Sequence, residues 1–116
     1  MSIQVDVKEL AATLEKYDFA YLVTVSGEHR SHVVACRPLL EGEALKIGGL
    51  GRRTSTNLSA RPAITLVYPP TEPDGYTLLV DGHASADGDS VSIEPQHAVL
   101  HRPADHGHDC VPVAEL

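Results

Sequence analysis

The sequence predicts one mainly β domain, built as a small barrel or sandwich. Short apolar and β-branched runs recur along the chain and are separated by tight turns, which is typical of antiparallel strands. The length of 116 residues suits a single domain. Trp is absent and Phe occurs once, so the core must be built mainly from Val, Leu, Ile and Ala. A domain this small buries little apolar surface alone, and we therefore expect a partner subunit.

Two helices are expected. An apolar stripe at three- and four-residue steps, following Asp6 as a capping residue, predicts an amphipathic helix over residues 7–17. The second helix is short. Thr54 or Ser55 is expected to cap it, and it should run to Ala60, just before the proline that stops it.

The expected strands are rich in Val, Ile, Leu and Tyr and lie between turn residues. In chain order they are 19–25, 30–37, 45–48, 63–68, 76–86 and 91–94. Gly82 interrupts the fifth strand, which predicts a bulge or bend there. From Gln96 onward the pattern is weak. The barrel is therefore expected to occupy residues 7–95, and residues 96–116 are expected to form a tail of uncertain order.

The formal net charge is −7 and the pI is near 5.3, which argues against a general nucleic-acid-binding protein, because such proteins carry a basic face. The two cysteines, Cys36 and Cys110, form neither a disulfide framework nor a CxxC pair. No segment approaches the roughly 18 uninterrupted apolar residues of a membrane-spanning helix. The N-terminus lacks the basic and apolar regions of a signal peptide. We expect a cytoplasmic protein with neither nucleic-acid nor membrane partners.

The segment from Gly48 to Ser55 carries the most informative chemistry. Its glycines let the backbone approach a ligand closely, and the first turn of the following helix offers free N–H groups and a positive dipole end. Arg52 and Arg53 add guanidinium groups, and Thr54 and Ser55 add hydroxyls. In a chain of net charge −7, this combination indicates a phosphate-binding site.

This segment matches neither of the common phosphate-binding fingerprints. It lacks the lysine of a P-loop and the spacing of the GxGxxG dinucleotide motif. From local chemistry alone, a glycine turn that leads into a capped surface helix with solvated arginines is an equally good interpretation. The surrounding segments favour the phosphate site.

Four segments carry a resemblance to a known family: RSHVVACRPL (30–39), ALKIGG (44–49), GRRTSTNLSARPAITLVY (51–68) and YTLLVDGHA (76–84). In this order and spacing, the chain resembles the pyridoxamine 5′-phosphate oxidase-like FMN-binding split-barrel family, which also includes enzymes that use the deazaflavin F420. The resemblance covers residues 7–95 and implies a split β-barrel that works as a homodimer. It also implies a cofactor, FMN or F420, with haem as a less favoured alternative.

The resemblance places the cofactor phosphate at the start of the second helix. Arg53 and Thr54 fall at the pair that grips the phosphate, with Arg52 and Ser55 beside them. Thr54 stands where vitamin B6 oxidases usually have a second basic residue, and the C-terminus lacks the Arg- and His-containing tail that those oxidases use. Oxidation of pyridoxamine phosphate itself is therefore not expected.

Further residues fall at cofactor-side positions by the same resemblance. Arg37 ends the second strand beside the flavin ring and the ribityl chain. Gly48 and Gly49 line the cofactor with their backbone. Thr77 lies on the strand that closes the site from the partner subunit. His32 lies on the second strand, where it either contacts the ring or simply packs.

The function that these features imply is hydride or electron transfer to a small molecule by an FMN- or F420-dependent oxidoreductase. No catalytic side chain is identified. Two alternatives from other classes stay open: a non-catalytic protein that binds or carries flavin, F420 or haem, and a structural dimer that has lost its cofactor. The cluster of arginines and hydroxyls argues against the latter.

A metal site near the C-terminus is the other chemistry to weigh. His97, His101, His106 and His108 lie close in sequence to Cys110. Their spacing matches no established zinc pattern, and a fourth ligand is not obvious. A polar tail without a metal is the expectation.

Overall fold

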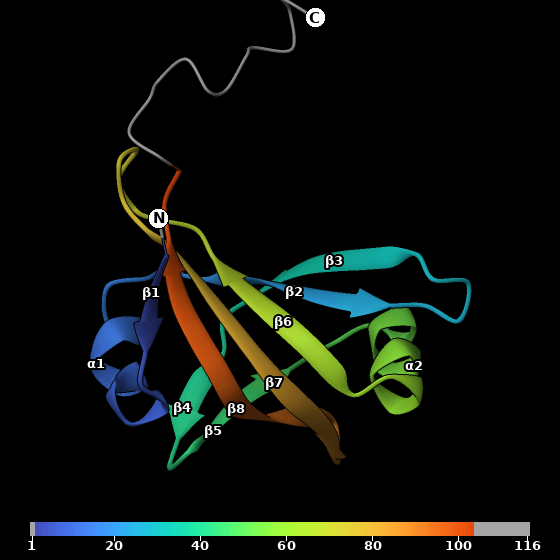
Figure 1. The fold of residues 1–116 in the computed structure, drawn as a ribbon. Coiled ribbons are helices and arrows are strands. Elements are labelled where there is room, and N and C mark those ends of the chain that lie inside the picture. The colour runs from blue at the N-terminus through green and yellow to red at the C-terminus, as the bar shows by residue number, and fades with distance from the viewer. Residues whose placement is uncertain (1, 104–116) are drawn as a thin grey trace, which may run out of the picture.

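The computed structural model describes residues 2–103, which form one curled antiparallel sheet with short helices beside it (Figure 1). In chain order the elements are β1 (Ser2–Val5), the 3-10 helix η1 (Val7–Glu9), α1 (Leu10–Leu14), β2 (Ala20–Val25), β3 (Ser31–Cys36), β4 (Leu39–Glu41), β5 (Ala44–Gly48), α2 (Arg52–Ala60), β6 (Ala63–Tyr68), β7 (Thr77–Asp87) and β8 (Ser90–His101). The prediction of a mainly β barrel is confirmed.

The two edge strands of the sheet are joined by only two residues. The strand order is β3-β2-β6-β7-β8-β5-β4, with β1 pairing to β8 as well, so β3 and β4 lie at opposite ends of the order. Arg37 and Pro38 connect the last residue of β3 to the first residue of β4. Three Cα–Cα steps span at most about 11 Å. The sheet must therefore curl until its edges meet at this link, which makes it a half-barrel.

β8 holds the sheet together because it pairs with three other strands. β7 follows it along its whole length, while its other edge pairs first with β5 and then with β1. The register between β7 and β8 shifts after Asp81, which confirms the bulge predicted at Gly82. At Gly82, a Cβ would lie 2.7 Å from the carbonyl oxygen of Glu94 and 2.8 Å from Cγ2 of Ile93. Glycine is therefore required by the close approach of the two strands.

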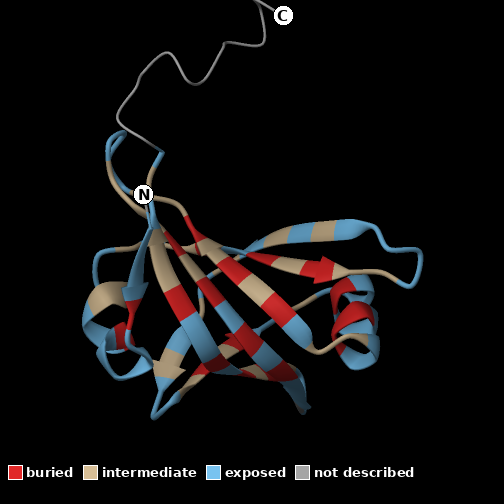
Figure 2. Ribbon diagram, viewed as in Figure 1, coloured by how far each residue is buried: buried red, intermediate tan, exposed pale blue. Residues whose placement is uncertain are grey.

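The core lies on the inner face of the curled sheet, where alternate residues of the strands are buried (Figure 2). Its completely buried apolar side chains include Leu22, Leu45, Leu66, Leu78, Val80 and Ile93. Tyr68 is the one aromatic residue among the buried hydrophobic residues of the described chain. The predicted Val, Leu, Ile and Ala core is confirmed.

The boundaries of both helices differ from the predictions. The helix expected over residues 7–17 is instead η1 followed by α1 and ends at Leu14. Asp6 does cap it, since its carboxylate accepts a hydrogen bond from the backbone N–H of Lys8 at 2.9 Å. The second helix was expected to begin after a Thr54 or Ser55 cap. It begins at Arg52 instead, with Gly51 as the residue before the helix.

β1 and the C-terminal part of β8 were not anticipated. β1 has one buried residue, Val5, and its partner β8 lies about a hundred residues away, so no local pattern indicates it. β8 runs on to His101, although residues from Gln96 onward were expected to form a tail. The register shift places Gln96 as an extra residue in this strand and interrupts its alternation, which explains the weak pattern. The short β4 was also missed.

Gly82→Ala should lower the free energy of unfolding by about 2 kcal/mol, because the new methyl group would overlap the β8 backbone. Urea denaturation measures this loss. Gly48→Ala is the matched control at the end of a strand: no atom lies within 4 Å of a Cβ there, so its unfolding free energy should change by about 0.5 kcal/mol or less. Equal losses in both variants would contradict the close packing at the bulge.

Candidate functional site

A buried hydrogen bond fixes α2 against the sheet. Asn57 Nδ2 donates to Thr24 Oγ1 on β2 at 3.1 Å, and the two residues are 4% and 1% exposed. The Thr24 hydroxyl in turn donates to the backbone carbonyl of His32 on β3, at 3.5 Å and so at the upper limit for a hydrogen bond. Buried polar groups need partners, so this chain of contacts sets how α2 lies on the β2–β3 hairpin.

The N-terminus of α2 is built to attract an anion. The residue before the helix is Gly51, which has no side chain to accept hydrogen bonds from the first-turn N–H groups, and that turn contains no acidic residue. Arg52, Arg53 and Ser55 are all exposed there. Unpaired N–H groups, a positive helix-dipole end and two guanidinium groups together form a donor set that suits a phosphate.

The two arginines lie on different flanks of α2. Successive helical residues are about 100° apart, and residues four apart lie on the same side. Arg53 therefore shares its side with Asn57, toward the β2–β3 hairpin. Arg52 instead shares a shallow hollow with Ser55 and Ser59. A group bound at the N-terminus can therefore contact Arg53 on one flank of the helix and Arg52 on the other.

The strand registers relate three of the predicted cofactor-side residues to other elements: His32 to α2 through Thr24, and Arg37 to Gly48. His32 pairs with Thr24, which bonds to the helix. Arg37 precedes Leu39 by two residues, and Gly48 follows Lys46 by two residues. Since Leu39 pairs with Lys46, Arg37 and Gly48 lie at the same end of the β4–β5 ladder.

The segment between β5 and α2 has the backbone shape that its glycines allow. Gly49 has a φ of 69°, a left-handed conformation that side chains other than glycine rarely adopt. At Gly48 and Gly49 nothing lies within 4 Å of where a Cβ would stand. The backbone there is open to a ligand.

Two of the predicted residues are placed differently. Thr54 is 1% exposed and lies on the buried stripe of α2, so its side chain packs inward rather than toward a ligand. Thr77 pairs with His101 at one end of β7. Ala84 lies seven residues further along this strand, and its N–H donates to the carbonyl of Pro62, just after α2. Seven strand residues span about 23 Å. Thr77 is therefore remote from α2 of its own chain.

The structure also reveals a cavity that was not anticipated. It has a volume of about 500 Å³ and lies between α2 and the β7–β8 hairpin. Ser55 and Ser59 line it from the helix, and Ser85 lines it from β7. The four-residue spacing of Ser55 and Ser59 indicates that both lie on one flank of the helix. No local pattern in the sequence indicates that β7 forms the opposite wall of the cavity.

The thiol of Cys36 on β3 and the phenol of Tyr68 on β6 are unreactive at neutral pH. Burial raises the pKa of Cys36 to about 11. Burial, together with the charge interaction with Cys36, raises the pKa of Tyr68 well above its ordinary value. The Tyr68 hydroxyl has no hydrogen-bond partner among the described residues. At neutral pH both groups stay protonated, so neither is a candidate nucleophile or base.

The histidines weighed as metal ligands separate into two groups. His106 and His108, together with Cys110, lie outside the described residues. His101 Nδ1 lies 3.0 Å from Ser2 Oγ, and His97 Nδ1 lies 3.4 Å from Asp81 Oδ2. Within residues 2–103, no three His, Cys, Asp or Glu side chains are grouped to hold a metal ion. In the same range, no helix is long and apolar enough to cross a membrane.

Comparison with known proteins finds two relatives that align over nearly the whole of both chains. No family model matches the chain. Uncharacterized protein Mb0449c of Mycobacterium bovis and uncharacterized protein MT0457 of Mycobacterium tuberculosis are each 40% identical to it over 133 aligned positions, which cover 93% of this chain and 94% of the relative.

Solved structures share the fold at low sequence identity. F420 reductase has a TM-score of 0.63 and 19% identity, over 75% of this chain and 93% of that one. The FAD binding protein from Mycobacterium smegmatis has a TM-score of 0.63 and 14% identity, over 86% and 97%. A protein from Clostridium acetobutylicum, related to general stress protein 26 and of the pyridoxinephosphate oxidase family, has a TM-score of 0.66 and 12% identity, over 84% and 91%. The predicted split-barrel fold is confirmed.

Asn57→Ala should lower the free energy of unfolding by about 1–3 kcal/mol, because a buried hydrogen bond is lost and Thr24 loses its donor. Urea denaturation measures the change. Ser59→Ala, an exposed position on the same helix, is the control and should change it by about 0.5 kcal/mol or less. Matching midpoints for the two variants would show that this bond does not anchor α2.

Proposed function

We propose that this chain, which belongs to the family of the two mycobacterial proteins, binds a flavin or deazaflavin phosphate ester such as FMN or F420. The phosphate would lie at the N-terminus of α2, and the bound group would transfer a hydride or electrons to a small molecule. The observation that carries the proposal is the uncapped first turn after Gly51, flanked by Arg52 and Arg53 and held beside β3 by Asn57.

Each residue of the site has a distinct part in this proposal. Arg53 grips the phosphate from the β2–β3 side, and the open backbone at Gly48 and Gly49 leaves room for the rest of the cofactor. In this proposal His32 and Arg37 contact the cofactor from β3 and from the link that follows it, as the family resemblance implies. The protein supplies binding, orientation and shelter from water, while the cofactor supplies the redox chemistry. The names of the structural neighbours, an F420 reductase and an FAD binding protein among them, support a flavin-type ligand.

Arg53→Ala should weaken cofactor binding far more than it weakens the fold. A charge-assisted contact between arginine and phosphate contributes about 1.5–3 kcal/mol, or about ten- to a hundredfold in affinity. Arg53 is exposed, so the unfolding free energy should change by about 0.5 kcal/mol or less. Titration of FMN and F420 into both proteins, followed by absorbance, measures the first effect, and thermal melts measure the second.

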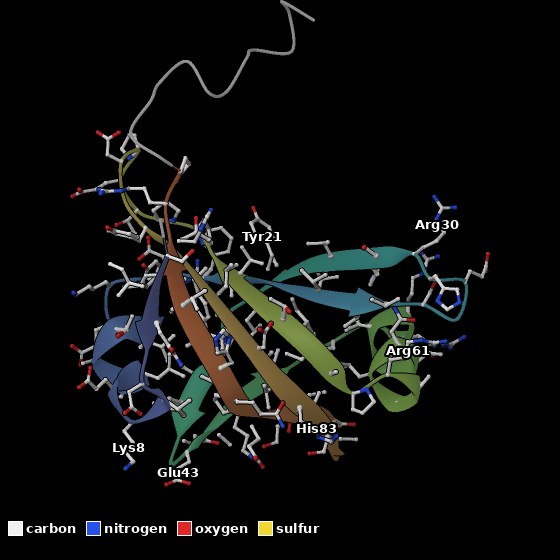
Figure 3. The ribbon with its side chains drawn as sticks, viewed as in Figure 1. Lys8, Tyr21, Arg30, Glu43, Arg61 and His83 are labelled. Atoms are coloured by element: carbon white, nitrogen blue, oxygen red, sulfur yellow. The ribbon has the colours of Figure 1, made fainter. Side chains whose placement is uncertain are left out.

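Arg30→Ala is the control for this experiment. Arg30 lies at the outer end of the β2–β3 hairpin, and its side chain points away from α2 (Figure 3). Its loss should change neither affinity nor stability. Equal affinities of wild type and Arg53→Ala, for whichever cofactor binds, would place the phosphate elsewhere. Anaerobic reduction of the bound cofactor and mixing with acceptors tests the electron transfer, and a cofactor that exchanges no electrons would make the protein a carrier.

We also propose that two copies of the chain form a dimer through the outer face of the sheet. The antiparallel registers align one apolar residue from each of five strands in a single row: Ala35, Tyr21, Val67, Leu79 and Val99. Tyr21 points outward from this face (Figure 3). Val33 continues the apolar surface in the next row and is 53% exposed. A patch of this kind favours association, and a two-fold contact is the commonest solution.

The proposed dimer gives Thr77 a part in the site. Within one chain Thr77 is far from α2, and it lies near Leu79 at the apolar end of β7. In the proposed arrangement it contributes to the site of the partner copy, as the family resemblance implies. This part of the proposal rests on the dimer.

Val33→Glu should convert the dimer to a monomer, because a charge on the apolar face must be desolvated for the copies to associate. Light scattering at micromolar concentration measures the mass, with twice the chain mass expected for the wild type. Val7→Glu is the matched control, since Val7 is 37% exposed but lies on η1. A wild type that scatters as a monomer would overturn the proposal.

A further inference from the structure

The outer face of the sheet carries a second row of side chains beside the apolar row of the proposed dimer. Its members, one from each of five neighbouring strands, are Val33, Val23, Thr65, Asp81 and His97. Asp81 lies two residues from Leu79 on β7, and so about 7 Å from it on the same face. His97 lies at the same spacing from Val99 on β8. An interface of about 800 Å² per partner is about 28 Å wide, so a second copy that covers the apolar row also covers Asp81 and His97.

The polar end of this row is linked by side-chain contacts. Thr65 Oγ1 donates to Asp81 Oδ1 at 2.6 Å, and His97 Nδ1 lies 3.4 Å from Asp81 Oδ2. Each carboxylate oxygen of Asp81 therefore faces a partner on a neighbouring strand. In the single chain the side chains of His97 and Asp81 are 50% and 54% exposed. Water then solvates the carboxylate whether or not the imidazole carries a proton, and the pair contributes little.

The other titratable groups on the elements around this pair are His83 on β7, Glu94 and His101 on β8, Asp6 after β1, and Lys8 and Glu9 on η1. His83 and Glu94 face each other one step further from the apolar row (Figure 3). The Asp6 carboxylate accepts the N–H of Lys8 at 2.9 Å and so caps η1. His101 lies four residues along β8 from this pair. Among the described residues, a carboxylate and an imidazole in contact beside the apolar row occur only in the Asp81–His97 pair.

Association through this face changes the energetics of the pair. A carboxylate that loses its water without a counter-charge costs several kcal/mol, whereas a carboxylate beside an imidazolium enters the interface as a neutral pair. The dimer therefore favours the protonated form of His97 more than the single chain does. We propose, on the basis of the proposed dimer, that each His97 takes up a proton when two copies associate, so that acidification strengthens the dimer.

The direction of the pH dependence follows from this proton uptake. Because the dimer binds more protons than the separate chains, raising the pH through the range in which imidazole loses its proton favours dissociation. The dissociation constant of the full chain, measured by analytical ultracentrifugation at equal ionic strength, should be at least about tenfold higher at pH 8 than at pH 6.

Two variants test the pair from its two sides. His97→Gln removes the proton, so its dissociation constant should differ by less than about threefold between pH 6 and pH 8. Asp81→Asn removes the charge that has to be desolvated and keeps an oxygen for Thr65. At pH 8 it should therefore dimerise at least about tenfold more tightly than the wild type. Both side chains are half exposed, so thermal melts of the variants should match the wild type.

His83→Gln is the matched control, because His83 also faces a carboxylate across β7 and β8 but lies further from the apolar row. It should keep the pH dependence of the wild type. A wild-type dimer with the same dissociation constant at both pH values, or a His97→Gln dimer as pH-dependent as the wild type, would overturn this inference and leave the dimer standing. A wild type that is monomeric at both pH values would overturn the inference and the dimer together, and the cofactor titrations would still decide the phosphate site separately.

Discussion

The two-residue link between β3 and β4 is the constraint on which the rest of the structure depends. Because Arg37 and Pro38 join the strands at the two ends of the sheet order, the sheet has to curl until those edges meet. The barrel is therefore closed at the link. α2 lies away from this link, beneath the β2–β3 hairpin, where it contacts β2 and β7 (Figure 1). The bond from Asn57 to Thr24 places the helix against β2, whose Thr24 pairs with His32 on β3.

The rotation of α2 about its own axis then decides what its two arginines can reach. The helix buries a stripe formed by Thr54, Asn57 and Leu58, and a buried amide tolerates only the orientation in which it finds a partner. The bond from Asn57 to Thr24 selects that orientation. A rotation by one residue would move every side chain by about 100° and carry Arg53 away from the β2–β3 hairpin. A polar contact in the core thus positions a basic turn on the surface of an acidic protein.

Local patterns predicted the elements that local chemistry determines. The strand Ala63–Tyr68 has the predicted bounds, because a turn on each side limits an uninterrupted apolar run. The bulge at Gly82 was predicted because glycine marks a close approach of two strands. The helix start was wrong by three or four residues, since Gly51 rather than Thr54 or Ser55 precedes α2 and supplies no side-chain cap. The end of β8 was missed because the extra residue Gln96 interrupts its alternation, and the cavity beside α2 depends on segments about thirty residues apart.

The position of Thr77 connects the proposed site to the proposed dimer. β7 extends from the apolar row at Leu79 to the cavity at Ser85, so one strand carries both the proposed surface for a second copy and one wall of the cavity beside α2. If residues of both copies contact one cofactor, the cofactor binds the dimer better than the monomer. Ligand binding then stabilises the dimer by mass action, and dilution weakens both together. In the proposed arrangement a small barrel would gain stability from that coupling, because a partner and a cofactor would cover surface that a single chain leaves exposed.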